Sequence, residues 1–196
     1  MNQPLSHDAL KQLFIDARSH HHWQDKSISE DTLRQLYDLT KWGPTSMNIS
    51  PLRILFLTSK EAKEKLVPTL MGSNVDQVRS SPVTAILAQD MEFFHHLPKL
   101  FPHFDAKSFF VGNQELTDIS AIRNSSLQGG YFMIAARALG LDVGPMSGFD
   151  NAKVDEVFFK GTSLKSNFLC NIGYGDATKL FPRDVRLSFD EACKIL

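Results

Sequence analysis

The longest helical pattern in the chain, residues 114–139, is the feature that most limits its possible folds. Apolar side chains recur along it at helical spacing, and Gly140 directly after it is a residue type that commonly ends helices. The rest of the sequence predicts several shorter helices and three short apolar strands, at residues 52–58, 83–88 and 168–173. Three strands are too few for a doubly wound sheet, and G-x-G-x-x-G follows none of them. We therefore predict one α+β domain over residues 1–196 without a Rossmann nucleotide site.

Capping residues and helix breakers predict the shorter elements. Ser6, Ser29 and Asp150 are suitable N-caps, and Ser188 with Glu191 forms a capping box. The first helix is predicted over residues 6–18, and residues 60–71 are predicted to be helical until Pro68. Prolines break residues 91–113 into short helix and loop, and residues 144–149 are predicted to form a loop.

Composition and charge exclude two classes of partner. The formal net charge is −1 without a basic stripe, so a nucleic-acid footprint is not expected. No block of like charges suggests a polybasic membrane anchor, and no stretch approaches the roughly 18 apolar residues of a membrane span. The opening MNQPLSHDALKQLF lacks the pattern of a signal peptide, and Cys170 and Cys193 cannot form a disulfide framework. We expect a cytoplasmic protein.

Four polar clusters interrupt the predicted core elements, at residues 18–22, 44–51, 74–77 and 183–186. Arginine in the first and last clusters suits phosphate, because its planar fork binds two oxygens at once. Each cluster alone fits a solvated turn, whereas together they fit a ligand with one phosphate and one hydrogen-bonding heterocycle. Adjacent histidines such as those at 20–22 point in different directions and have no carboxylate or cysteine partner at ligand spacing, so no metal is expected.

At these residues the chain resembles the FMN-dependent nitroreductase family over essentially its whole length. Single motifs are weak, but five in order at family spacing are specific. In chain order the matching pieces are Arg18-Ser19-His20, Pro44-Thr45-Ser46-Met47-Asn48-Ile49-Ser50-Pro51-Leu52, Asn74 with Gln77, Gly140-Leu141 with Pro145-Met146-Ser147-Gly148-Phe149-Asp150, and at the end Ile172-Gly173-Tyr174-Gly175-Asp176 with the basic pair Arg183 and Arg186.

The resemblance implies an α+β nitroreductase-like fold, with a central, mainly antiparallel sheet flanked by helices. It also implies an intertwined homodimer with flavin at the interface, FMN as cofactor, NADH or NADPH as co-substrate and a small-molecule acceptor. No side chain is required as nucleophile or general acid, so no catalytic residue is assigned. The FMN contacts that it implies are Arg18, Ser19, His20, His22, Pro44, Thr45, Ser46, Asn48, Asn74, Gln77, Pro145, Met146, Ser147, Gly148, Arg183 and Arg186.

A closer resemblance is to the family branch that contains the malonic semialdehyde reductases of pyrimidine degradation (Rut). It implies ping-pong reduction of a 3-oxo acid to 3-hydroxypropionate. Arg123 is then the candidate contact for the substrate carboxylate, and the alternative is a surface arginine bonded to Asp118 or Glu115. The stretches that carry this closer resemblance are residues 41–46, 123–126, 144–150 and 171–176.

Departures from the family leave other interpretations open. His22 and Gln77 stand where members often place a lysine near the flavin, so neutral donors or a protonated His22 would take its role. Ser50 and Leu52 replace the family's Gln and Trp. The alternatives are a general nitroaromatic or quinone reductase, a non-catalytic flavin-binding protein, and a cofactor-free helical interaction domain. The Phe-rich residues 93–110 predict either core packing or a mobile lid.

Overall fold

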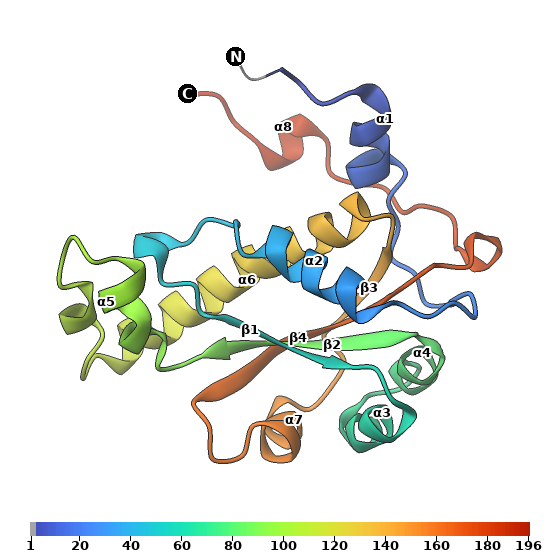
Figure 1. Cartoon of the computed structure of the whole chain (residues 1–196). Coiled ribbons are helices and arrows are strands. Elements are labelled where there is room, and N and C mark those ends of the chain that lie inside the picture. The colour runs from blue at the N-terminus through green and yellow to red at the C-terminus, as the bar shows by residue number, and fades with distance from the viewer. Residues whose placement is uncertain (1–2) are drawn as a thin grey trace.

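A four-stranded antiparallel sheet lies at the centre of the structure, a computed structural model that describes residues 3–196 (Figure 1). Its order is β1-β2-β4-β3, and its strands are β1 (Leu52–Leu57), β2 (Val83–Asp90), β3 (Asp142–Met146) and β4 (Leu164–Gly173). β2 pairs with a strand on each side and is buried along its whole length, since helices cover both faces of the sheet. The predicted α+β class with a central antiparallel sheet is confirmed.

Strand β3 shows that the prediction of a loop over residues 144–149 was wrong for residues 144–146. Gly144 and Pro145 weaken a strand pattern, but β3 is an edge strand that pairs only with β4 in this sheet, and edge strands tolerate proline. Gly144 is required because the carbonyl oxygen of His20 would lie 2.3 Å from a Cβ atom at this position. The first polar cluster therefore runs directly against β3, with a parallel bridge between Ser19 and Val143.

Helices form a layer on each face of the sheet (Figure 1). One layer consists of α2 (Glu30–Thr40) and α6 (Gln114–Ala138), and α3 (Lys60–Leu66), α4 (Asn74–Ser80) and α7 (Asn151–Phe158) form the other. Beyond the first layer lie α1 (His7–Leu10) and α8 (Phe189–Ala192), so both ends of the chain are on the same side. No helix in the described part of the chain is both long and apolar enough to cross a membrane.

Local capping signals agree with the helix starts. The side-chain oxygens of Ser6, Ser29 and Asp150 accept the backbone N–H three residues later, at 3.2, 3.1 and 3.1 Å. Glu191 accepts the N–H of Ser188 at 2.8 Å, as a capping box requires. Gly140 has a φ of +75°, the left-handed conformation that follows many helices.

Three helices differ from the sequence prediction. The helix predicted over residues 6–18 ends earlier, because α1 continues as a π-helical turn over Lys11–Ile15 and the chain then extends toward β3. α3 ends at Leu66, and Pro68 lies in the 3-10 turn that follows. α4 was not predicted, since only Val75 and Val78 supply it with apolar side chains.

The Phe-rich segment divides between core and surface. Phe93 and Phe110 are buried with their rings edge to face, 4.9 Å apart between centroids, beside α5 (Leu97–Leu100). Phe104 and Phe109 are exposed and lie 5.4 Å apart. Core packing is therefore confirmed for the first pair, and the broken pattern of short turns agrees with the prediction for residues 91–113. The lid remains a prediction.

Candidate functional site

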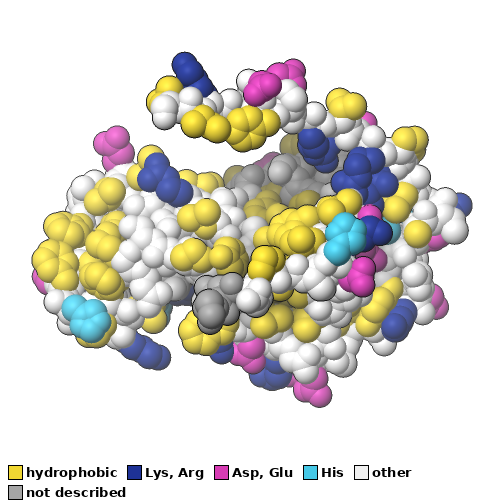
Figure 2. Space-filling view, turned by 90° about the horizontal axis from the view of Figure 1, so that it is seen from above, with side chains coloured by type: hydrophobic (Ala, Val, Ile, Leu, Met, Phe, Trp, Pro, Cys, Tyr) yellow, Lys and Arg dark blue, Asp and Glu magenta, His cyan; other side chains and the backbone are white. Residues whose placement is uncertain are grey.

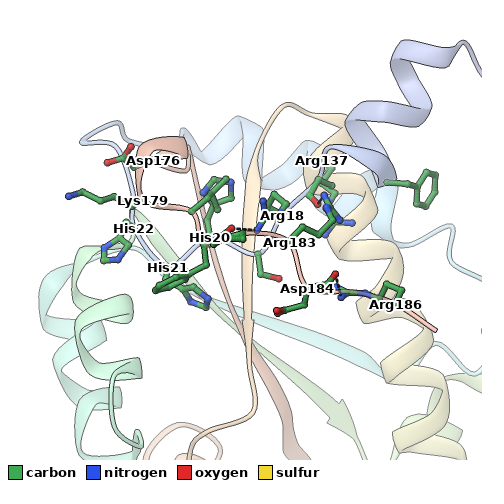
Figure 3. Close-up of a pocket in the computed structure, with 16 residues that line it drawn as sticks. Arg18, His20, His21, His22, Arg137, Asp176, Lys179, Arg183, Asp184 and Arg186 are labelled. Carbon is green, nitrogen blue, oxygen red and sulfur yellow. Dashed lines mark hydrogen bonds between the residues drawn. The ribbon is translucent and has the colours of Figure 1, made fainter. Parts of the chain in front are cut away.

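A cavity of about 400 Å³ lies where the segment after α1 meets the C-terminal segment (Figure 3). Its walls come from three parts of the chain that are distant in sequence: residues 14–22, Arg137 at the end of α6, and residues 176–186. The structure thus brings the first and last polar clusters together, including Arg18, Arg183 and Arg186.

Arginine side chains tie the two segments to each other through backbone carbonyls. Arg18 Nη2 donates to the carbonyl of Phe181 at 2.5 Å. In the opposite direction, Arg183 Nη2 donates to the carbonyls of Ile15 and Ala17 at 2.7 and 2.8 Å. These contacts keep both guanidinium groups at the cavity while leaving several of their five N–H donors available.

The charge of the cavity is strongly positive. Five cationic side chains line it, against two carboxylates, those of Asp176 and Asp184. Asp176 is engaged locally, because its Oδ1 accepts the N–H and the hydroxyl of Thr178 at 2.9 and 2.6 Å, and these bonds lower the pKa of its carboxyl. The excess of cations, mostly arginine, suits an anion with several oxygens such as a phosphate. The cations are Arg18, Arg137, Lys179, Arg183 and Arg186.

His20 lies at the base of the cavity, where its ring is buried with 5% of its surface exposed. Its Nε2 lies 3.4 Å from Asp142 Oδ1, and its ring centroid is 6.2 Å from that of Trp23. Burial is the largest influence on the ring and lowers the pKa of His20, although Asp142 opposes this shift. A Cβ atom at Gly175 would lie 2.0 Å from His20 Nδ1, so a glycine is required there. The burial of the ring indicates a packing role more than a ligand contact.

The third polar cluster, at the start of α4, is joined to the loop after β3. Asn74 Nδ2 donates to the carbonyl of Gly148 at 2.8 Å, and a Cβ at Gly148 would lie 2.6 Å from that nitrogen. His21 Nδ1 and Gln77 Oε1 are 2.8 Å apart, so His21 links this cluster to the cavity segment. The sequence had pointed to His22 for this neighbourhood, and His22 instead lies on the outer side of the cavity (Figure 3).

The loop after β3 offers backbone rather than side-chain contacts. Across the described residues, nothing accepts a hydrogen bond from the N–H of Ser147 or Gly148. Met146 faces the core instead, where its sulfur lies 3.8 Å from Asn171 Nδ2, and Pro145 is half-buried in β3. The loop therefore presents two free N–H donors beside Asn74.

The second polar cluster, Pro44–Pro51, is not brought to this cavity within one chain. Ser46 N–H donates to Asn124 Oδ1 in α6 at 2.9 Å, and Asn48 Nδ2 donates to the carbonyl of Leu100 in α5 at 2.9 Å. The loop lies near α5 at one end of the sheet, whereas the cavity segments meet near the opposite end (Figure 1). Met47, Asn48 and Ser50 have φ values of 47°, 52° and 40°, a strained conformation that these contacts hold in place.

Arg123 is likewise separate from the cavity. It is exposed on α6, and Asp118, one of its two expected partners, accepts a hydrogen bond from Gln114 at 2.7 Å. Sequence reasoning missed two residues of the site, Arg137 and Lys179, and it placed His21 in the first polar cluster without giving it a role. The one available signal was a single charge within the apolar run Ala135-Ala136-Arg137-Ala138.

Comparison with known proteins gives consistent results. The model of the nitroreductase family matches residues 16–174. A Burkholderia lata protein with the provisional name NADH dehydrogenase/NAD(P)H nitroreductase is 56% identical over 191 residues, which cover 97% of this chain and 98% of that protein. A provisionally named nitroreductase from Exiguobacterium sibiricum, solved in complex with FMN, has a TM-score of 0.86 at 22% identity, with both chains covered to 100%. A provisionally named NAD(P)H:FMN oxidoreductase from Staphylococcus epidermidis has a TM-score of 0.86 at 20% identity, again over 100% of both chains.

Proposed function

The chain belongs to the nitroreductase family, and we propose that it is an FMN-dependent NAD(P)H oxidoreductase that acts as a homodimer. The observation that carries the proposal is the arginine-lined cavity, which is joined through His21 and Gln77 to the free N–H donors of the loop after β3. The arginine-lined cavity suits a phosphate, and the N–H donors of the loop suit a flat heterocycle with hydrogen-bonding edges.

The donor set fits the phosphate of FMN. Arg18 and Arg183 reach the cavity from opposite segments, and Arg186 and Lys179 add further positive charge. One terminal phosphate matches the one cluster of arginines that this cavity brings together. We therefore expect FMN rather than FAD, with Ser19 at the edge of the phosphate subsite.

The residues around Gly148 fit the ring edge of a flavin. The N–H groups of Ser147 and Gly148 would donate to it, and Asn74 and Gln77 would supply amide groups from α4. Bound FMN would accept hydride from NADH or NADPH and pass it to the acceptor. Gln77 stands at one of the positions where a lysine is common in the family, and His21 Nδ1, 2.8 Å from Gln77 Oε1, would orient its amide group toward the flavin.

Three features support a homodimer with flavin at its interface. The first is an exposed apolar stripe along α6, and the second is a C-terminal arm with exposed apolar side chains that stands off the body of the molecule (Figure 2). The third is the strained Pro44–Pro51 loop, which would supply Pro44, Thr45, Ser46 and Asn48 to the partner's flavin. Many exposed apolar side chains grouped in this way are typical of a binding surface. The residues are Leu116, Ile119, Ile122, Leu127 and Tyr131 on α6, and Phe181, Val185, Leu187 and Phe189 on the arm.

For the acceptor, we propose malonic semialdehyde, reduced to 3-hydroxypropionate in pyrimidine degradation. The support is the resemblance of residues 123–126, 144–150 and 171–176 to that branch. Arg123, exposed on the α6 stripe, would meet the substrate carboxylate if a second chain brings the flavin to this face. The second candidate is a general nitroaromatic or quinone reductase, which the provisional name of the Burkholderia lata relative favours. The cytoplasmic location stays a prediction.

The absorbance spectrum of the purified protein tests the proposal. We expect a yellow protein whose extracted cofactor runs as FMN on chromatography, whose visible band is bleached by NADH or NADPH without oxygen, and whose band returns on adding an acceptor. A yellow protein that NAD(P)H does not bleach would be a flavin-binding protein without turnover. A colourless protein that takes up no added FMN would contradict the proposal, as would extracted FAD.

A further inference from the structure

Arg137 is a half-buried cation in the last turn of α6, and only some of its N–H groups have hydrogen-bond partners. Its Nη1 donates to the carbonyl of Leu13 at 3.1 Å. Its Nε is buried and has no hydrogen-bond partner among residues 3–196. A guanidinium has five N–H donors, so Arg137 holds unused donors at the wall of the cavity.

Within residues 3–196, Arg137 forms no ion pair with a carboxylate. Asp142, the acidic side chain whose charge acts on it, lies 3.4 Å from His20. Partial burial is the largest influence on Arg137 and lowers its pKa. A cation that is partly withdrawn from water is stabilised by an opposite charge, so this position favours the arrival of an anion.

Three arginines of the cavity, Arg18, Arg137 and Arg183, differ in the groups that they already contact. Arg18 and Arg183 each join one terminal segment to the other, whereas Arg137 projects from α6 beside them (Figure 3). α6 packs on the sheet through core side chains that include Phe132 and Ala136. Arg137 is thus the one of these three that is carried by a core helix and not by a terminal segment.

We propose that Arg137 supplies the counter-charge for a phosphate bound in this cavity, and that it thereby makes the protein select FMN over riboflavin. This inference rests on the proposed function, because FMN is the phosphate ligand that the cavity would hold. The unused Nε–H and Nη–H groups would bind phosphate oxygens, while Arg18 and Arg183 close the site from the terminal segments.

The competing interpretation is a structural one, in which Arg137 only fastens the N-terminal segment to α6. The structure separates the two roles, because Gln12 Nε2 donates to the backbone carbonyl of Arg137 at 2.7 Å. That bond does not need the arginine side chain and remains when it is replaced. A structural role would affect every ligand equally, whereas a phosphate contact would affect FMN and leave riboflavin unchanged.

The test compares Arg137→Gln and Arg137→Lys with the parent, all stripped of flavin. Arg34→Gln is the matched control, because it removes one guanidinium from the exposed face of α2, where Arg34 pairs with Glu30. Affinities for FMN and for riboflavin are measured by quenching of flavin fluorescence. The Tm of each protein is measured with and without inorganic phosphate, since a ligand that binds only the native state raises Tm.

We expect Arg137→Gln to raise the Kd for FMN about ten- to a hundredfold and to change the Kd for riboflavin less than about twofold. The Kd of Arg137→Lys for FMN should be intermediate, because an ammonium keeps the charge but not the planar, two-pronged donor geometry of the guanidinium. Phosphate should raise the Tm of the parent and of Arg34→Gln, and raise it less in Arg137→Gln.

Equal losses for FMN and riboflavin, or no loss for FMN, would overturn the role of Arg137. If Arg137→Gln does not fold, Arg137→Lys provides the test. A ratio of the FMN Kd to the riboflavin Kd that is the same in Arg137→Lys as in the parent would also overturn the role of Arg137. A parent that binds no FMN would contradict the proposed function instead. In that case the difference in phosphate-induced Tm shift between the parent and Arg137→Gln still decides whether Arg137 binds an anion.

Discussion

Gly175→Ala is expected to destabilise the protein severely, through a single atom placed against His20. The added Cβ would lie 2.0 Å from Nδ1 of His20 and 2.3 Å from two ring carbons. The ring is buried beside Trp23 and Asp142, so any movement away from Gly175 disturbs these contacts. Gly175 is itself buried, and its N–H donates to Asp142 Oδ2 at 2.8 Å. Relief of the clash must therefore displace the ring, the Asp142 contact or both.

The expected magnitude follows from these two contacts. Overpacking in a well-filled interior costs about 1–3 kcal/mol. Loss of the bond to Asp142 adds about 0.5–1.5 kcal/mol. The sum, about 1.5–4.5 kcal/mol, corresponds to a fall in Tm of about 3–18 °C, because each kcal/mol shifts the Tm of a chain of this length by about 2–4 °C.

Thermal unfolding of the flavin-free protein, followed by circular dichroism, measures this change. Gly130→Ala is the control: no atom lies within 4 Å of a Cβ there, so a helical alanine should be neutral or stabilise by about 0.5–1 kcal/mol. A double-mutant cycle with His20→Ala isolates the clash, because Gly175→Ala should cost less once the ring is gone. A Tm for Gly175→Ala within about 1 °C of the parent, or costs that simply add in the double mutant, would refute the reasoning.

Four further outcomes are expected. Arg18→Ala should raise the Kd for FMN about ten- to a hundredfold in fluorescence titration, and an unchanged Kd would mean that the other arginines hold the phosphate without it. Light scattering should report twice the 22.1 kDa mass of the chain, and a flavin-loaded particle of 22.1 kDa would contradict the dimer. Arg123→Ala should lower kcat/KM for malonic semialdehyde about tenfold more than for a neutral nitroarene, whereas equal losses would exclude a carboxylate contact. Burial lowers the pKa of His20 below 6.5, so the unfolded chain takes up a proton at this ring at a higher pH than the folded chain, and the stability that the neutral ring contributes should be lost as pH falls below 6.5. When the free energy of unfolding is measured against pH, the His20→Gln variant should lack this part of the slope. An unchanged slope would assign it to other groups.

Much of the fold was predictable from short-range signals. Ser29 and Asp150 cap the helices that follow them, and Gly140 ends α6, because each of these interactions involves residues within three or four positions of one another. The apolar runs of β1, β2 and the second half of β4 were found for the same reason. The sequence also indicated which residue types could hold a phosphate and a heterocycle, since that depends on the chemistry of the side chains.

Other features were decided by tertiary structure, because they depend on contacts between residues that are distant in the sequence. β3 contains Gly144 and Pro145 and is a strand only because β4 pairs with it and the His20 backbone crosses close above it. The choice of His21 rather than His22 as the neighbour of Gln77 depends on how the chain leaves that crossing.

Arg137 shows the same limit for the candidate site. In the sequence it is one charge within the apolar run Ala135-Ala136-Arg137-Ala138, and this signal does not show whether the side chain is covered or exposed, as Arg123 is on the same helix. Its partial burial arises when the segments that carry Arg18 and Arg183 lie against the end of α6. Residue chemistry is a property of the sequence, whereas burial and the partners of a charge exist only after distant segments have packed together.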